Sequence, residues 1–373
     1  MVVAHAGVVA FNIGAFVSSL FLLEFGADKF IAHTSIVAAR IKISEVIIGL
    51  VTAGAEWEEN PPLLTKSSTY DKLAVVVGSL AQGRSSLALG NVVGAAISNI
   101  LGAFSLGLLF YGQGEVVGFD RSSRIYSLLL LVLTTAVTPL VYWSAAITWL
   151  AGGIVLIAAF VVYFLLIAVA IGKGVLTAPA DSDSDSDDDD DDDDDDANSV
   201  SSRTTLLNDG TTARQSRRRH GLGYHALYLV SGFLAICLAG YILSQAATNI
   251  TDELGMSDIL FSVVILAIAT TLPEKFIAVM SGSRGRPGIL VANCAGSNIF
   301  LLSLCCGIIM VGTRGALDKG TVTIAELSVL WLSTVAFTAT VWFGGSYARW
   351  IGVAMLASYV AFIILEFTVI HAI

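Results

Sequence analysis

The sequence predicts an all-α polytopic membrane protein with about ten transmembrane helices in two inverted five-helix repeats. The 373-residue chain is 55% hydrophobic and 13% charged, with a mean hydropathy of +0.79. Soluble domains, in contrast, carry roughly 25% charged residues. Apolar segments long enough to cross a bilayer recur along the whole chain. One hydrophilic segment, residues 172–222, separates five of these segments from the other five.

The apolar segments define the domain organisation. Those of the first half are 5–25, 41–59, 85–111, 125–145 and 147–171, and those of the second half are 224–248, 257–280, 288–312, 322–343 and 349–371. The first segment lacks the basic flank and cleavage site of a signal peptide, so we interpret it as a retained helix. The chain then divides into an N-terminal half (1–171), a linker (172–222) and a C-terminal half (223–373). An odd number of helices per half gives the halves opposite orientations, as in many secondary transporters.

The linker carries the acidic charge of the protein. Thirteen aspartates lie between Asp181 and Asp196, and without them the net charge of −10 becomes +3. The segment is rich in Ser, Thr, Asp and Arg and has no apolar periodicity, so we expect it to be disordered. The aspartate tract is either a solvated spacer or a weak buffer or sensor of cytosolic Ca²⁺. It lacks the spacing of a defined calcium loop.

Basic residues predict the orientation of the helices in the membrane. Threading ten helices places 14 lysines and arginines on the side of the linker and five on the other side, namely Lys66, Lys72, Arg84, Arg314 and Lys319. Cytosolic loops carry an excess of basic residues. We therefore expect the linker to be cytosolic and both termini to be lumenal or extracellular.

The two halves contain matching motifs. The second half carries "ATTLPEKFIAVMSGSRGRPGILVANCAGSNIFLLSL" (269–304), and the first carries "GAEWEE" followed by "LAVVVGSLAQGRSSLALGNVVGAAISNILGAF" (73–104). Glu274 precedes Asn293 by 19 residues, whereas Glu59 precedes Asn91 by 32. Setting aside residues 60–72 as a thirteen-residue insertion brings both glutamates and both Asn-x-x-Gly motifs into register.

These motifs resemble the two α-repeats of the sodium/calcium exchanger (cation/Ca²⁺ antiporter) superfamily, which read G-T-S-x-P-E on one helix and G-N-x-x-G-S-N-x-x-N/D on the next. The repeats fall at about 41–111 and 257–312, and the resemblance covers nearly the whole chain. It implies a secondary active antiporter that exchanges Ca²⁺ for H⁺ or Na⁺ by alternating access, without a cofactor. We expect no enzyme, because no zinc-protease motif or nucleophile elbow occurs. The expected partners are the lipid bilayer and small inorganic cations, with no nucleic acid.

The resemblance also implies a cation site with one acid from each half. Glu59 and Glu274 are the expected ligands of the transported Ca²⁺, a hard cation that prefers oxygen. Further expected cation-binding groups are Asn99, Thr270, Thr271, Ser297 and Glu56, which shares a helix face with Glu59. Residues expected to line the site or to pack helices are Asn91, Asn293, Gly94, Gly296 and Pro273. Pro273 removes a helix hydrogen bond and so frees a carbonyl for the ion.

Two departures from the family pattern leave alternatives open. Leu301 and Ala95 stand where the pattern has polar side chains. The oxygen ligand missing at position 301 favours coupling to H⁺ over coupling to Na⁺. The alternatives are a Na⁺/Ca²⁺ or Mn²⁺ exchanger, and a transport-inactive scaffold or regulatory protein that retains the fold. The linker is too short for the folded calcium-sensing domain of the family, which favours an endomembrane (vacuole, ER or Golgi type) over the plasma membrane.

Overall fold

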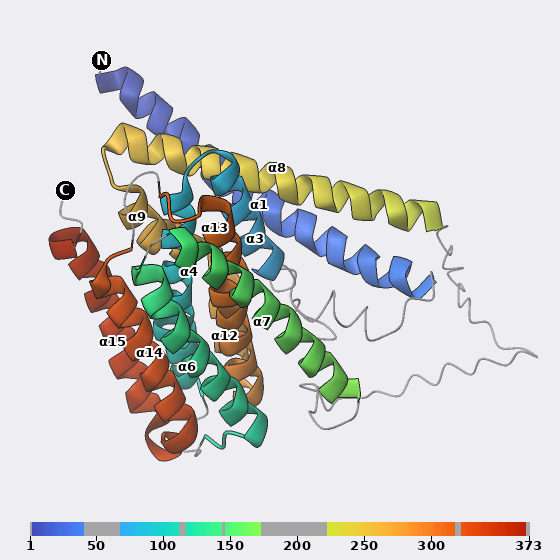
Figure 1. Ribbon diagram of the computed structural model, residues 1–373, viewed down its shortest axis with the longest axis vertical. Helices are drawn as coiled ribbons and strands as arrows, with labels where there is room; N and C mark the ends of the chain where they lie inside the picture. Colours follow the sequence, from blue (N-terminus) through green and yellow to red (C-terminus); the bar gives the residue numbers. More distant parts are fainter. Residues whose placement is uncertain are drawn as a thin grey trace, which may run out of the picture.

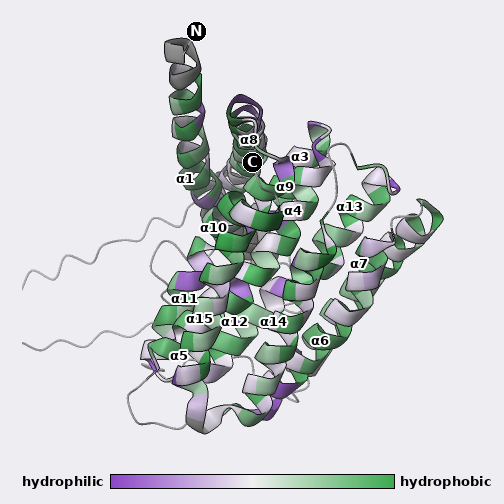
Figure 2. Cartoon of the chain, turned by 90° about the vertical axis from the view of Figure 1, so that its left-hand side faces the viewer, coloured by the Kyte–Doolittle hydropathy of each residue, from purple (hydrophilic) through white to green (hydrophobic). Residues whose placement is uncertain are grey.

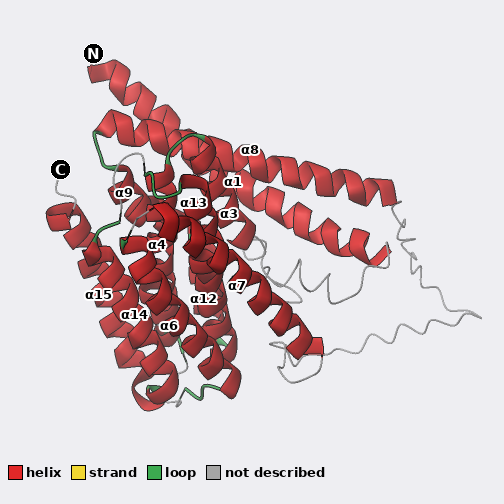
Figure 3. Cartoon of the chain, viewed as in Figure 1, coloured by secondary structure: helices red, strands yellow, loops and turns green. Residues whose placement is uncertain are grey.

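The computed structural model describes residues 2–40, 68–111, 117–143, 146–172, 222–317 and 322–370. Within these ranges the regular elements are helices and no strand is present (Figure 3). Eight helices are long and apolar enough to span a membrane, and a bent pair makes a ninth span. These nine correspond to nine of the ten predicted segments. The tenth, 41–59 with Glu56 and Glu59, lies outside the described residues, as does the linker from 173 to 221.

The helices follow in the same order in both halves. The first half contains α1 (Val2–Arg40), α3 (Ser68–Ala81), α4 (Ser85–Ile97), η1 (Ser98–Phe104), α5 (Ser105–Leu109), α6 (Arg121–Tyr142) and α7 (Ala146–Gly172). The second half contains α8 (Leu222–Leu254), α9 (Asp258–Leu260), η2 (Phe261–Leu266), α10 (Ala267–Thr270), α11 (Leu272–Ser283), α12 (Pro287–Phe300), η3 (Leu301–Cys305), α13 (Cys306–Thr313), α14 (Ile324–Phe343), η4 (Gly345–Tyr347), α15 (Ala348–Leu365) and η5 (Glu366–Ile370). The η4 element is a 3₁₀ turn, and the other η elements are π-helical turns within longer spans.

The two central spans are α4 with η1 and α5, and α12 with η3 and α13. In their most apolar windows 89% and 67% of the residues are buried, compared with 22% in the spans of α1, α7 and α15. The outer helices therefore turn apolar side chains outward, toward the bilayer. Figure 2 shows most of the ribbon in the green of hydrophobic residues.

Helices α1 and α8, the first helices of the two halves, form a pair that crosses the bundle obliquely (Figure 1). Their backbones meet at Gly26 and Gly232: a Cβ atom on Gly26 would lie 2.9 Å from the backbone nitrogen of Ile236, and one on Gly232 would lie 2.7 Å from that of Phe30. Small residues allow membrane helices to approach in this way. A separate apolar cluster, which includes Leu23, fills the space between this pair, α3 and η2.

Glycines also bring α4 into backbone contact with η2. A Cβ atom on Gly94 would lie 2.3 Å from the carbonyl oxygen of Val263, which leaves no room for a side chain. Gly296, which is 202 positions further along the chain, has no atom of the described residues within 4 Å of an added Cβ. Within the described residues, the two glycines of the matched motifs therefore differ in their contacts.

This difference predicts that the same substitution has unequal effects at the two positions. Gly94→Ala should destabilise the protein by about 1–3 kcal/mol, because the new methyl group overlaps the backbone of η2. Gly296→Ala serves as the matched control and should change stability little. Thermal unfolding of the purified protein in detergent measures both effects. Equal midpoints for Gly94→Ala and the wild type would contradict the packing described here.

Candidate cation site

A broken helix positions the acidic residue of the second half. The axes of α9–α10 and α11 meet at Thr271 with a bend of 48°. Pro273 lies in the first turn of α11, where a missing N–H costs no helical hydrogen bond. Glu274 follows in the same turn, so its carboxylate lies at the positive end of the helix dipole. The carboxylate is fully buried.

Within the described part of the chain, the side chains of Ser297, Asn293 and Lys72 contact Glu274. The Ser297 hydroxyl lies 3.4 Å from Glu274 Oε1, and Asn293 Nδ2 donates to the Glu274 backbone carbonyl at 3.4 Å. The ammonium group of Lys72, on α3, forms an ion pair with Glu274 Oε1 and also donates to Ser297 Oγ. The side chains of Lys72 and Glu274 are both 0% exposed. The site is thus a buried ion pair between the two halves.

The expectation that Lys72 lies in a loop outside the membrane is wrong. Residues 68–72, the described part of the predicted insertion, belong to helix α3. Because Lys72 lies in this helix, it no longer counts among the five loop residues that the predicted topology places opposite the linker. The excess of basic residues on the side of the linker is therefore larger than the loop count indicates.

Lys72 occupies the position in the first half that Glu274 occupies in the second. Three pairs of residues are each separated by 202 positions: Lys72 and Glu274, Gly83 and Gly285, and Asn91 and Asn293. Both glycines of these pairs have positive φ angles, +69° and +66°, in the turn after α3 and after α11. The match extends backward in sequence, because Ser68 and Thr69 stand 202 positions before Thr270 and Thr271. No gap is needed over this stretch.

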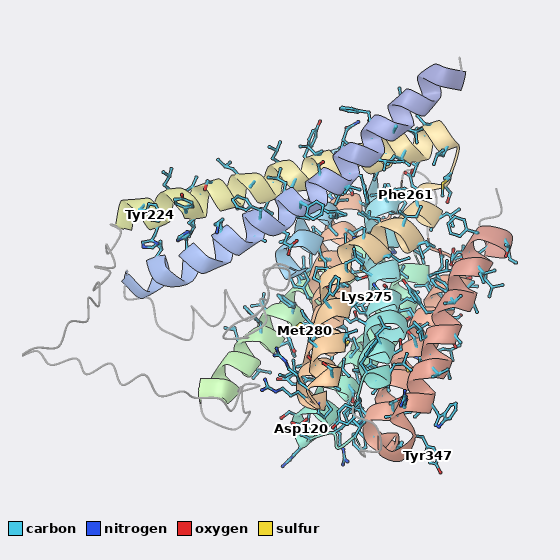
Figure 4. The ribbon with its side chains drawn as sticks, turned by 180° about the vertical axis from the view of Figure 1, so that it is seen from behind. Asp120, Tyr224, Phe261, Lys275, Met280 and Tyr347 are labelled. Atoms are coloured by element: carbon cyan, nitrogen blue, oxygen red, sulfur yellow. The ribbon has the colours of Figure 1, made fainter. Side chains whose placement is uncertain are left out.

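A second lysine lies beside the ion pair, in a pocket of hydroxyl groups. Lys275 Nζ donates to Ser98 Oγ at 2.8 Å and to Thr271 Oγ1 at 2.5 Å, and the Tyr359 hydroxyl donates to Ser98 at 2.8 Å. Figure 4 shows Lys275 within the bundle, between Phe261 toward one end and Asp120 at the other. In the described part of the chain, the charged groups of this cluster are therefore the Glu274 carboxylate and the ammonium groups of Lys72 and Lys275.

Amide side chains connect the central spans of the two halves. Asn99 Nδ2 donates to Asn298 Oδ1 at 2.9 Å and to Ser297 Oγ at 3.1 Å, and Asn298 Nδ2 donates to the Ala96 carbonyl at 3.0 Å. Asn99 lies in the π-helical turn Ser98–Phe104, a deviation that is frequent at functional sites. Among the described residues, the side-chain oxygens of Asn99 and Asn293 are buried and accept no hydrogen bond. These two oxygens are available to a ligand.

The structure brings together only part of the predicted site. Glu274, Ser297, Asn99 and Asn293 lie in one connected cluster. Other predicted residues pair separately: the Thr270 hydroxyl contacts Asn91 Oδ1 at 3.3 Å, and the Thr271 hydroxyl contacts Ser98 at 2.9 Å. Leu301, the departure from the pattern, is fully buried at the start of η3.

Sequence reasoning missed Lys72, Lys275, Asn298 and Ser98. The constant spacing of 202 was available in the sequence and would have identified Lys72. The other three are polar side chains within apolar segments, and such residues often mark a site in membrane proteins.

An ion-pair cluster joins the turn between α3 and α4 to the second half. Arg84 donates to Asp258 at 3.0 Å and 3.1 Å and to Asp252 at 2.5 Å. Burial alone would lower the pKa of Arg84, but the hydrogen bond to Asp252 and the charge of Asp258 raise it above its ordinary value. The cluster fixes the end of α3, and through it the position of Lys72, relative to α9.

Two inverted halves with a broken helix and a buried polar cluster between them define a membrane protein of the secondary-transporter class. A family model described as "Sodium/calcium exchanger protein" matches residues 11–169 and 224–368, which is most of the chain. The chain belongs to the sodium/calcium exchanger family, whose members are transporters and not enzymes.

Relatives from bacteria and archaea cover similar ranges. CaxA of Alkalimonas amylolytica, whose name describes an antiporter, is 27% identical over 299 residues, 80% of either chain. An uncharacterized membrane protein of Methanocaldococcus jannaschii is 24% identical over 352 residues, 94% of this chain and 96% of the relative. The sodium/calcium exchanger MaX1 of Methanosarcina acetivorans is 26% identical over 160 residues, 40% of this chain and 43% of the relative.

Two solved structures share the fold. The structure of native YfkE has a TM-score of 0.62 at 14% identity, covering 96% of this chain and 92% of the other. The sodium–calcium exchanger NCX_Mj, soaked with 10 mM Na⁺ and no Ca²⁺, has a TM-score of 0.52 at 18% identity, covering 95% of this chain and 99% of the other. The likeness to both structures supports the all-helical fold of this chain.

The amide network predicts that Asn99 stabilises the contact between the halves. Asn99→Ala leaves the buried Oδ1 atom of Asn298 without its donor, which should cost about 1–3 kcal/mol. Thermal unfolding in detergent measures the loss. Ser358→Ala is the control, because this exposed hydroxyl bonds only to its own helix, at the Ala354 carbonyl. Equal losses for the two variants would contradict a stabilising role of the network.

Proposed function

We propose that the protein is a secondary active antiporter that exchanges Ca²⁺ for H⁺ or Na⁺ by alternating access, with Glu274 as a ligand of the transported ion. The observation that supports this best is the fully buried Glu274 carboxylate at a helix break, facing polar groups of the other half. Carboxylates at such depth are energetically expensive and usually functional. Glu59 and Glu56, outside the described residues, remain predicted ligands from the first half.

The surrounding donors suit a hard cation. Ca²⁺ takes six to eight oxygen ligands, including carboxylates and amide carbonyls. Besides Glu274, the cluster offers the Ser297 hydroxyl and the buried amide oxygens of Asn99 and Asn293, which accept no hydrogen bond from the described residues. Mn²⁺ also binds such ligands and is the alternative cargo.

H⁺ is the counter-ion that we favour. Leu301 stands 202 positions after Asn99, so the second half lacks the oxygen ligand that the first half supplies. A site with fewer oxygens holds Na⁺ less well, whereas a carboxylate accepts a proton without further ligands. Coupling to Na⁺ is the alternative.

The loops support a proposal for the membrane and for the orientation. We propose that the two halves, 1–171 and 223–373, are joined by a cytosolic linker, with both termini on the opposite side, as the distribution of basic residues supports. The short linker favours an internal membrane over the plasma membrane. In sealed vesicles whose cytosolic face is outside, an added protease should cut the linker and spare epitope tags at both termini. Loss of the tags with an intact linker would contradict this orientation.

A second candidate function is a transport-inactive scaffold that keeps the exchanger fold. The specific observation in its favour is the ion pair between Lys72 and Glu274, because an ammonium group already neutralises the carboxylate. Leu301 supports it as well. A flux measurement separates this candidate from the antiporter.

The proposed function predicts that Glu274→Gln abolishes exchange. Liposomes that contain the full chain should take up radiolabelled Ca²⁺ when a pH gradient is imposed. Glu274→Gln should reduce this flux about tenfold or more, because a charged ligand is lost. Glu253→Gln, which changes an exposed glutamate of α8, is the matched control and should transport like the wild type.

Three other outcomes are informative. Equal fluxes for Glu274→Gln and the wild type contradict the assignment of the site. Uptake that follows a Na⁺ gradient and ignores pH replaces H⁺ by Na⁺ as the counter-ion. Background flux in the wild type and in both variants favours the scaffold.

A further inference from the structure

Among the described residues of the first half, a lysine forms an ion pair with Glu274, at the position that matches the acid of the second half. We propose that Lys72 is the resident cation of the Glu274 site and determines its selectivity, because a transported cation binds Glu274 only by displacing the Lys72 ammonium group. This inference rests on the proposed function, in which Glu274 is a ligand of the cargo.

The contacts of Lys72 are those of a bound cation. Its Nζ atom donates to Glu274 Oε1 and Ser297 Oγ, and both oxygens belong to groups that ligate hard cations. Ser297 Oγ is also 3.1 Å from Asn99 Nδ2, so the ammonium group lies where the two halves meet. A metal ion and this ammonium group cannot use the same oxygens at the same time.

The balance of charge makes the competition strongest for divalent cations. Lys72 neutralises Glu274, and Lys275 places a second ammonium group nearby, with its own partners Ser98 and Thr271. The repulsion between an incoming ion and these groups grows with the charge of the ion. While Lys72 stays in place, the site therefore discriminates against Ca²⁺ more than against Na⁺.

The surrounding structure holds Lys72 in the site. Its side chain is 0% exposed, so it does not extend to the membrane surface as lysines at helix ends do. Helix α3 is fixed against α8 by the hydrogen bond from Ser244 Oγ to Ser79 Oγ at 3.1 Å. A buried ammonium group that loses its partner is unfavourable, so displacement of Lys72 opposes cation binding.

The test compares Ca²⁺ binding by wild-type protein and Lys72 variants. The full chain is purified in detergent and titrated with CaCl₂ by calorimetry, and the unfolding midpoint is recorded with and without CaCl₂. Lys72→Gln should raise the affinity for Ca²⁺ about tenfold or more, and Lys72→Glu should raise it further. Lys72→Arg keeps the charge and should bind as weakly as the wild type. Lys29→Gln, the same change on α1, is the control.

The double variant Lys72→Gln/Glu274→Gln identifies the oxygen for which the two cations compete. It removes both charges of the pair and should show no gain in Ca²⁺ affinity. If Lys72→Gln alone is poorly folded, its unfolding midpoint should still rise more with CaCl₂ than that of the wild type, because Ca²⁺ replaces the missing charge. A structural role of Lys72 does not produce this selective stabilisation.

Two results overturn the inference. One is an unchanged Ca²⁺ affinity, with an unchanged CaCl₂-dependent shift of the midpoint, in Lys72→Gln and Lys72→Glu. The other is the same gain in the double variant as in Lys72→Gln. A different result would contradict the proposed function: a Ca²⁺ flux that Glu274→Gln leaves unchanged. If Glu274→Gln abolishes flux while Lys72→Gln binds Ca²⁺ like the wild type, only the role of Lys72 is wrong.

Discussion

The rest of the structure depends on one constraint: the Glu274 carboxylate is fully buried, so its charge must be compensated inside the bundle. A charge removed from water must be compensated by paired charges and hydrogen bonds, or it is too costly to keep. In the described part of the chain, compensation comes from the N-terminal turn of α11, the Ser297 hydroxyl of α12 and the Lys72 ammonium group of α3. These elements belong to different halves, so the bundle must close around the charge to compensate it.

The two halves share a backbone design but differ in chemistry at the site. Both have a glycine with positive φ after the short helix, at positions 83 and 285, and a π-helical turn in the central span, Ser98–Phe104 and Leu301–Cys305. At the site, however, lysine replaces glutamate at 72, and leucine at 301 replaces the amide found at 99. The two halves thus match in these backbone features, whereas each half has its own set of polar groups. The fold of this chain therefore combines matched backbones with unmatched charges.

Much of the fold could be predicted from the sequence, because hydropathy and length determine which segments cross the membrane. Nine of the ten predicted spans are present in the described residues. The convergence of Glu274, Ser297 and Asn99 was also predictable, because the matched motifs fix their register. Lys72 was not recognised, because Glu59 was matched to Glu274 in its place. That match shifts the register by thirteen residues and assigns Lys72 to a loop. Hydropathy does not distinguish a lysine in a loop from one buried against a carboxylate.

The position of Lys72 is tied to the α1–α8 pair through the backbone of α3. A Cβ atom on Gly78 would lie 2.6 Å from the Gly240 carbonyl oxygen, and one on Gly240 would lie 2.7 Å from that of Ala74. Contacts this close allow little sliding of α3 over α8 without separation of the helices. A displacement of α8 relative to the central spans therefore carries α3 with it and moves Lys72 away from Glu274.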